Sequence, residues 1–117
     1  MKILTGGVGK AQVADALKPL LRPEDEVVVA SDMQAGMALR NGSADYSLGT
    51  CHTGAGASLG VLVGLLGSAR CHTFGRGVPA AAAVQAAVEG GAVALGFAID
   101  QIEEVVPVVW GVLDARR

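Results

Sequence analysis

The sequence predicts an α/β fold, a three-layer α/β/α sandwich with a Rossmann-like, mainly parallel five-stranded sheet. Two observations predict it. Short apolar segments rich in Val, Ile and Leu alternate with longer segments whose apolar residues recur at helical spacing, and no pair of segments has the features of a β-hairpin. The connections are short, as right-handed crossovers between parallel strands allow. With 117 residues and no linker-like stretch, we expect a single domain, residues 1–117.

The first half of the chain contains three expected strands and two expected helices. Pro19 predicts a late kink or an early end of the first helix. Ser31 or Asp32 can cap the second helix, and Gly42 stands where a left-handed residue would end it. The strands are expected at residues 2–5, 27–30 and 45–50, and the helices at residues 10–21 and 33–41.

The same segments predict part of the core. The β-branched run at residues 27–30 is typical of a strand buried on both faces, and Met33 and Met37 are expected in the core. A third helix, residues 55–66, is apolar on nearly every side. Where small residues recur along one side of a helix, the backbone of a sheet, of another helix or of a partner subunit can approach that side closely. Here they recur every four residues: Gly56, Gly60 and Gly64.

The second half continues the alternation. Pro79 suits the first turn of a helix, Gly90 and Gly91 stop that helix, and Pro107 predicts a kink in the last helix. Two further strands are expected at residues 69–74 and 92–99, and two further helices at residues 80–89 and 100–115.

Composition and charge exclude several function classes. The formal net charge of −2 and the lack of a clustered basic face argue against a nucleic-acid partner. Residues 46–69 carry no formal charge, but glycines and polar residues interrupt the run, so we expect no membrane-spanning helix. The first residues lack the apolar segment of a signal peptide, which favours a cytoplasmic protein.

In an open parallel sheet, ligands bind outside the carboxyl ends of the strands. Cys51 is the sharpest candidate there. A thiol just before a helix N-terminus has a lowered pKa, whereas the alternative is a small buried hydrophobe, the usual place of a cysteine. The residues that follow favour the reactive thiol, because backbone amides and side-chain hydroxyls can together form an anion-binding nest. The expected nest residues are His52, Thr53, Gly54, Ala55, Gly56 and Ser58.

Two other loops belong to the same edge. The loop of residues 6–10 lacks the spacing of a Walker A loop, so Gly7 either lets the backbone approach a ligand or serves the turn alone. Arg76 lies in a second glycine-rich loop, and a single arginine can hold one phosphate. We expect no metal, because the adjacent residues of each Cys-His pair, at 51–52 and 71–72, point to opposite faces of a strand.

A thiolate beside such a nest suits proton abstraction next to a carbonyl or acyl transfer through a thioester. The segment from Cys51 to Ser58, preceded by residues 42–46, resembles the corresponding segment of ribose-5-phosphate isomerase B and the galactose-6-phosphate isomerase subunits. Residues 69–72 and 92–96 are also similar to that family, as is the start of the chain. The first loop departs from the family, which carries an Asp-His pair there, whereas this chain has Thr5-Gly6-Gly7-Val8.

The resemblance implies roles for several residues. Cys51 would be the base that moves a proton between C1 and C2 of an aldose phosphate, and Thr53 would handle the proton on oxygen. His72 would assist ring opening, and the backbone amides from His52 to Gly56 would hold the enediolate. No motif assigns the family's phosphate-binding arginines to positions of this chain, and Arg76, Arg116 or Arg117 could substitute for them. No cofactor is implied.

The whole chain also resembles a small bacterial family similar to YhfU, through Asp32-Met33 and residues 45–57. That family implies no established activity. The leading hypothesis is therefore a cytoplasmic sugar-phosphate aldose-ketose isomerase or a close relative. We expect a homodimer, with the glycine-striped helix and the last helix near the interface. The alternative is a non-catalytic module that uses the same nest to bind an anionic metabolite, or that sits within a larger assembly.

Overall fold

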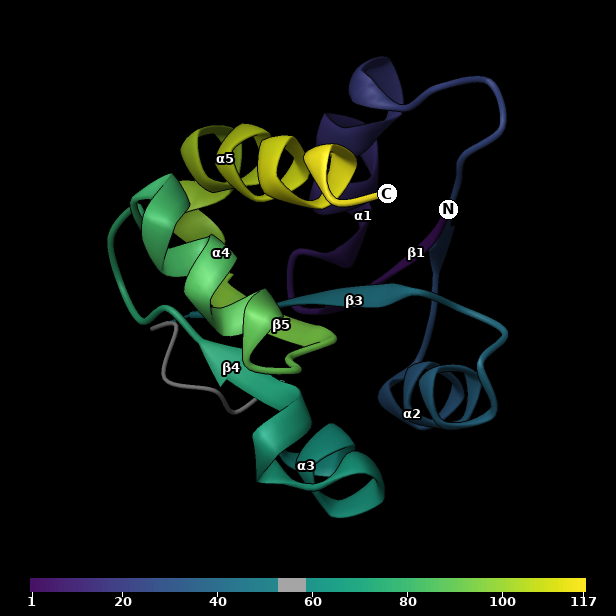
Figure 1. The fold of residues 1–117 in the computed structure, drawn as a ribbon. Coiled ribbons are helices and arrows are strands. Elements are labelled where there is room, and N and C mark those ends of the chain that lie inside the picture. Colours follow the sequence, from purple (N-terminus) through teal and green to yellow (C-terminus); the bar gives the residue numbers. More distant parts are fainter. Residues whose placement is uncertain (53–58) are drawn as a thin grey trace.

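The computed structural model describes residues 1–52 and 59–117, and it confirms the predicted three-layer α/β/α fold (Figure 1). Five strands form one sheet in the order β2-β1-β3-β5-β4, and every neighbouring pair is parallel. The strands are β1 (Lys2–Gly7), β2 (Glu26–Val29), β3 (Tyr46–Cys51), β4 (Cys71–Thr73) and β5 (Ala94–Ala98).

Helices connect the strands at nearly the predicted positions. The α-helices are α1 (Lys10–Leu17), α2 (Asp32–Asn41), α3 (Gly60–Leu66), α4 (Ala81–Glu89) and α5 (Ile102–Ala115). Single turns of 3-10 helix extend three of the connections: η1 (Lys18–Leu20), η3 (Ser68–Arg70) and η4 (Ile99–Gln101). Among these helices none has the length and apolarity that crossing a bilayer requires.

The handedness of the crossovers sorts the helices onto two faces. The connections from β1 to β2 and from β4 to β5 run in one direction across the sheet, and those through α2 and α3 run in the other. One core cluster accordingly joins α1, α4 and α5 to the sheet, and a second joins α2 and α3. Figure 1 shows α1 and α5 above the sheet and α2 and α3 below it.

Local sequence rules are confirmed at the ends of α2. Ser31 is the N-cap: its hydroxyl accepts a hydrogen bond from the Gln34 amide, and the Gln34 side chain accepts one from the Ser31 amide. Gly42 ends the helix with a left-handed φ of 81°. Pro19 lies in η1, directly after the early end of α1 that it predicts. Helix α5, in contrast, continues through Pro107.

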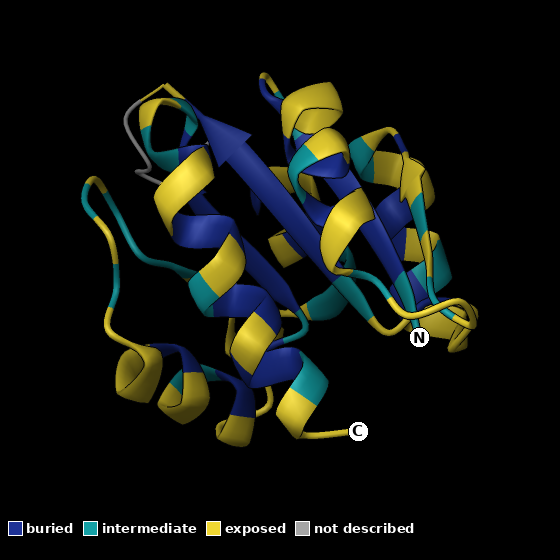
Figure 2. Ribbon diagram, turned by 90° about the horizontal axis from the view of Figure 1, so that it is seen from above, coloured by how far each residue is buried: buried dark blue, intermediate teal, exposed yellow. Residues whose placement is uncertain are grey.

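Two predictions about burial are wrong. Strand β2 is an edge strand rather than one buried on both faces, and Val29 is 45% exposed. Met33 and Met37 are 57% and 48% exposed, because α2 turns Ala35 and Leu39 toward the sheet instead. In Figure 2 the central strands are buried along their length, while much of the surrounding layers is exposed.

The close approach between α2 and α3 occurs at Gly36 rather than at the glycine stripe. A Cβ on Gly36 would lie 2.3 Å from Cδ1 of Leu65. A Cβ on Gly60 or Gly64 would meet nothing within 4 Å, so these two glycines do not mediate an approach within the described chain. Gly56 lies outside the described residues. A role of the stripe toward a partner subunit stays a prediction.

Candidate functional site

The strand order creates a switch point between β1 and β3. The connection that leaves β1 runs to one side of the sheet and the connection that leaves β3 runs to the other. In open α/β sheets the crevice outside the carboxyl ends of two such strands is where ligands bind. At this crevice lie Gly7, the last residue of β1, Cys51, the last residue of β3, and His52, which follows it; all three were singled out from the sequence.

The turn from β1 to α1 is anchored to the end of β3. The Val8 amide donates to the Thr50 carbonyl oxygen at 3.1 Å, and the Gly9 amide donates to Thr50 Oγ1 at 2.7 Å. Thr50 Oγ1 in turn donates to the Gly6 carbonyl oxygen at 3.3 Å. Thr50 is fully buried, so its hydroxyl fixes the shape of the crevice floor. Sequence reasoning missed it, although a threonine one residue before a candidate thiol was a usable signal.

Gly7 is required by this anchoring. Its φ is 81°, and a Cβ at this position would lie 1.9 Å from the Thr50 carbonyl oxygen. The close contact with β3 therefore explains why glycine occupies the position. Contact between Gly7 and a ligand stays a prediction.

Cys51 ends β3 and is 8% exposed. The Thr50 hydroxyl accepts a hydrogen bond from the amide of Gly9, directly before α1. Gly9 in turn lies against Ile102 of α5, since a Cβ on Gly9 would be 2.9 Å from Ile102 Cδ1. The Thr50 side chain therefore points toward α1 and α5. Successive strand residues point to opposite faces, so Cys51 faces the α2 and α3 layer. The thiol thus lies at the crevice, on the side of these two helices.

Arg76 is brought to the same edge. Its Nη2 donates to the His52 carbonyl oxygen at 3.4 Å, which ties the loop after β4 to the end of β3. Both side chains are exposed. The structure therefore gathers Cys51, His52 and Arg76 at one end of β3. The predicted site residues Thr53, Gly54, Ala55, Gly56 and Ser58 lie outside the described residues.

His72 is not brought to this place. It pairs in register with Leu95 of β5, whereas Cys51 pairs with Ala98, three residues further toward the carboxyl end, about 10 Å along the strand. His72 also contacts the ring of Phe74, at 4.8 Å between centroids, and Phe74 packs against the cluster on the α4 and α5 side. The two predicted partners therefore lie on opposite faces of the sheet, with β5 between them.

Three glycines in register cross the centre of the sheet at the crevice. Gly6 of β1 pairs with Gly49 of β3, which pairs with Gly96 of β5, and we call this set the glycine row. The row faces α2 and α3: a Cβ on Gly6 would lie 3.3 Å from Asp32 Oδ1, and one on Gly96 would lie 3.1 Å from Leu59 Cδ1. Glycines inside strands mark places where a ligand or another group approaches the backbone closely.

Asp32 borders the glycine row; it belongs to a loop that the sequence places at the carboxyl ends of the strands, but it was not among the predicted site residues. It is half-buried at the first position of α2, where Ser31 already serves as the cap. Its carboxylate makes no hydrogen bond or ion pair with any residue in the described part of the chain. An acidic residue after the second strand, beside a glycine turn after the first, is well placed to accept hydrogen bonds from hydroxyl groups.

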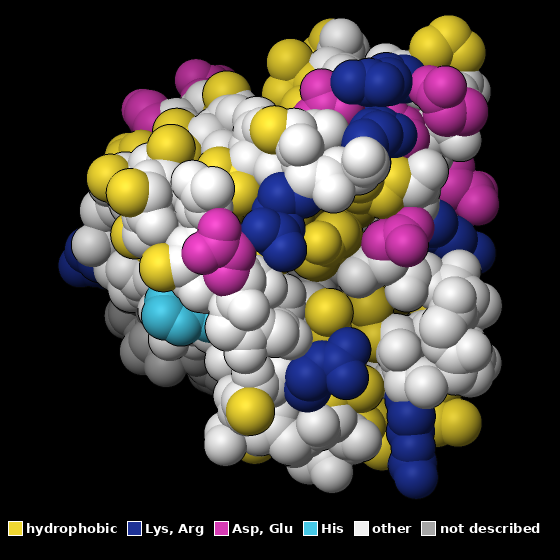
Figure 3. Space-filling view, in the orientation of Figure 1, with side chains coloured by type: hydrophobic (Ala, Val, Ile, Leu, Met, Phe, Trp, Pro, Cys, Tyr) yellow, Lys and Arg dark blue, Asp and Glu magenta, His cyan; other side chains and the backbone are white. Residues whose placement is uncertain are grey.

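Charged side chains of both signs are mixed on the face of the molecule that carries the two chain ends. In the upper part of the face shown in Figure 3, Lys and Arg side chains lie beside Asp and Glu side chains. Burial raises the pKa of the Cys71 thiol, an effect partly offset by Arg70, so Cys71 is a neutral thiol at pH 7. Among residues 1–52 and 59–117, no three His, Cys, Asp or Glu side chains gather as metal ligands would.

Comparison with known proteins gives the family. The chain is 28% identical over 110 residues to the protein YhfU of Escherichia coli strain K12, an alignment that covers 92% of this chain and 94% of YhfU. The YhfU proteins of Escherichia coli O6:H1 and Shigella flexneri match equally well. The sequence profile of the family described as "Protein of unknown function DUF2620" matches residues 1–113. The resemblance to YhfU is thereby confirmed, and the chain belongs to the DUF2620 family.

Proposed function

We propose that this protein binds a small anionic metabolite of the sugar-phosphate class in the crevice between β1 and β3. The glycine row is the observation that carries the proposal, because it places three positions without side chains in register across β1, β3 and β5, and two of them, Gly6 and Gly49, lie on the strands of the switch point. Leu59 and Thr73 fill the space over Gly96, so a polar ligand would approach the strand backbone at Gly6, beside Asp32.

The groups around the row match the two ends of such a ligand. The Arg76 guanidinium is held at the end of β3 by the His52 carbonyl, with donors to spare for a phosphate or carboxylate. Asp32 lies at the other side of the row, next to Gly6, and accepts hydrogen bonds from hydroxyl groups. A ligand with one anionic end and several hydroxyl groups fits this distribution of charge.

Cys51 is the residue that would make the protein an isomerase. A thiolate at the end of β3 would take the proton from C2 of a bound aldose phosphate and return it to C1, while Thr53 and the amides that follow would serve the oxygens. This mechanism extends the resemblance to ribose-5-phosphate isomerase B. It needs Cys51 to reach the substrate from the α2 and α3 side of the sheet.

A non-catalytic binding protein is the second candidate. Two observations favour it: Cys51 is 8% exposed, and His72 lies on the opposite face of the sheet. In that case Cys51 is a small buried side chain that supports the crevice, and the glycine row serves binding alone.

Binding is tested by titrating the ¹⁵N-labelled protein with inorganic phosphate and with ribose 5-phosphate and following amide chemical shifts. We expect shifts at Gly7, Val8 and His52, and a dissociation constant for ribose 5-phosphate that rises roughly tenfold in Arg76→Gln. Arg40→Gln is the matched control. Arg40 is also exposed, but it lies in the last turn of α2, toward the amino ends of the strands and away from the crevice. Equal affinity of wild type and Arg76→Gln would exclude this site.

Catalysis is tested separately by proton exchange. Pentose and hexose phosphates are incubated with the protein in D₂O, and deuterium at C2 is measured by NMR. If the protein is an isomerase, Cys51→Ala loses exchange and Cys71→Ala, which removes the thiol on β4, keeps it. If neither wild type nor variant exchanges deuterium while ribose 5-phosphate still binds, the non-catalytic function holds.

A further inference from the structure

Strand β2 presents an open, apolar edge. It is the outermost strand beside β1, and its residues after Glu26 are three valines, of which Val28 is 36% and Val29 is 45% exposed. Folded proteins protect such edges with lysine, proline, a bulge or a covering segment. The strand itself contains no lysine or proline, and it pairs with β1 without a bulge.

The backbone groups on this edge can be assigned from the pairing with β1. The Glu26 amide donates to the Met1 carbonyl and the Ala30 amide to the Thr5 carbonyl, each at 3.0 Å. Residues of a parallel strand alternate between the two neighbouring sides, so Val28 also bonds to β1. The N–H and C=O groups of Val27 and Val29 therefore point outward, and no backbone hydrogen bond between them and another part of the described chain is present.

We propose that β2 pairs with β2 of a second copy of this chain, antiparallel and about a two-fold axis through Val28. In this register Val27 faces Val29 of the partner subunit, and Val29 faces Val27 of the partner subunit. Each of the two pairs exchanges both N–H···O=C bonds, which satisfies all of the outward groups on both strands. The result is one continuous ten-stranded sheet, twice the five strands of one chain.

The side chains fit the same axis. Val28 meets Val28 of the partner subunit in a non-hydrogen-bonded pair, where side chains come closest, on the face of α2. Val27 and Val29 meet across the strands on the face of α1. Glu26 lies opposite Ala30 of the partner subunit, so no two like charges face each other within the strands. A two-fold interface must be self-complementary, and the edge of β2 meets this condition in the proposed register.

A second apolar surface competes for the same role. Met33, Met37 and Val61 are exposed on the outer side of α2 and α3, near the contact of Gly36 with Leu65. We favour the edge of β2 because it combines exposed apolar side chains with outward backbone donors and acceptors in matching register. The experiment includes the helical surface as the competing outcome.

The test exploits the position of Val28 on the axis. Wild-type protein is examined by sedimentation velocity over a roughly hundredfold range of concentration, together with Val28→Lys and Val28→Glu, each first shown to be folded by circular dichroism. We expect a wild-type dimer whose dissociation constant rises roughly tenfold or more in either variant, because two like charges then face each other. An equimolar mixture of the two variants restores the dimer, since lysine then faces glutamate.

Met33→Lys is the matched control, an exposed apolar side chain on the competing surface, and we expect it to leave the dimer unchanged. Hydrogen exchange gives a second measurement: the Val27 and Val29 amides become protected as the concentration of wild-type protein rises, while Val28 is protected throughout. A monomer at every concentration overturns the proposal. So does a dimer that Met33→Lys dissociates, or one that the mixture of charged variants fails to restore.

Discussion

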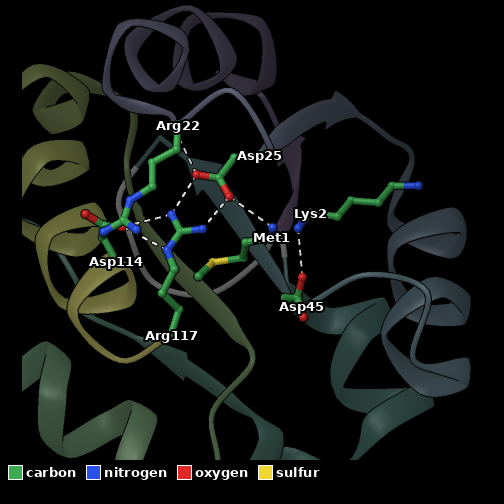
Figure 4. A network of polar contacts seen from close by, with 7 residues as sticks. All are labelled: Met1, Lys2, Arg22, Asp25, Asp45, Asp114 and Arg117. Atoms are coloured by element: carbon green, nitrogen blue, oxygen red, sulfur yellow. Dashed lines mark hydrogen bonds and ion pairs between the residues drawn. The ribbon is translucent and has the colours of Figure 1, made fainter.

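Asp25 and Arg117 lie 92 residues apart in the sequence and form a two-point ion pair that joins the loop before β2 to the end of α5 (Figure 4). Arg117 Nη2 donates to Asp25 Oδ2 at 2.6 Å, and Nη1 donates to Oδ1. The Met1 amino group also lies 2.9 Å from Asp25 Oδ1. The Asp25 side chain has no exposed surface, so Arg117 and the Met1 amino group take the place of water as hydrogen-bond donors to the carboxylate.

The pair predicts a loss of stability in acid. The hydrogen bond from Arg117 is the main reason why the pKa of Asp25 is held well below its ordinary value of 3.8, and the amino group adds to it. Because the folded-state pKa is lower than the unfolded-state pKa, the contribution is fully present above the ordinary value and is lost as pH falls through the folded-state pKa. Asp25→Asn should therefore be less stable than wild type at pH 7, with a difference that shrinks from about pH 4 downward. Urea unfolding at a series of pH values measures it.

Asp15→Asn is the control for this experiment. Asp15 pairs with Lys18 at 3.5 Å, but both side chains are more than half exposed, and such surface pairs contribute little to stability. We expect its free energy of unfolding to stay within about 0.5 kcal/mol of wild type at every pH. An Asp25→Asn protein with the same pH profile as Asp15→Asn would show that the covered pair adds nothing.

The contact between Gly7 and β3 predicts a difference between two left-handed glycines. Gly7 and Gly42 both have a φ of 81°, so alanine costs backbone strain of about 1–2 kcal/mol at either position. A Cβ on Gly42 meets nothing within 4 Å, whereas one on Gly7 would lie 1.9 Å from the Thr50 carbonyl oxygen. Gly7→Ala should therefore lose clearly more stability than Gly42→Ala in thermal unfolding. Equal losses would mean that the β1–α1 turn adjusts without cost.

The hydroxyl of Thr50 predicts a second effect at the crevice. Thr50→Val keeps the shape of the side chain but leaves the buried Gly9 amide without its acceptor, which costs about 1–3 kcal/mol. Thr73→Val on β4 is the matched change, because the Thr73 hydroxyl makes no hydrogen bond with a described residue, and we expect a change within about 0.5 kcal/mol. Urea unfolding compares the two. In Thr50→Val the Gly9 amide should also exchange faster with solvent.

Local patterns predicted the elements of this fold but not their neighbours. The alternation of apolar segments, the cap at Ser31 and the left-handed Gly42 depend on residues close in sequence, and all are confirmed. Strand order depends on which faces pack together, so a run of valines could not distinguish a central strand from the edge strand β2. For the same reason the spacing of Met33 and Met37 indicated one face of a helix without showing which face meets the sheet.

The candidate site shows the same division. The rule that ligands bind at carboxyl ends of strands brought Cys51, His52 and Arg76 to one edge from the sequence alone. It could not show that His72 faces the other side, because a shift of one residue in strand register reverses the face of every side chain. The glycine row could not be predicted either, because it also depends on strand register. Its members are 43 and 47 residues apart in the sequence, and only the pairing of β1, β3 and β5 aligns them.

The contact between α2 and α3 predicts opposite effects for alanine at two helical glycines. A Cβ on Gly36 would lie 2.3 Å from Leu65 Cδ1, so Gly36→Ala forces the helices apart or moves the leucine, at a cost of about 1–3 kcal/mol. Gly64 on α3 has open space around it, and alanine there gains about 0.5–1 kcal/mol from helix propensity. Thermal unfolding of dilute protein should therefore show a lower midpoint for Gly36→Ala and a higher one for Gly64→Ala. If Gly64→Ala is also destabilising, and more so at high protein concentration, α3 rather than β2 is the surface that meets a second copy of the chain.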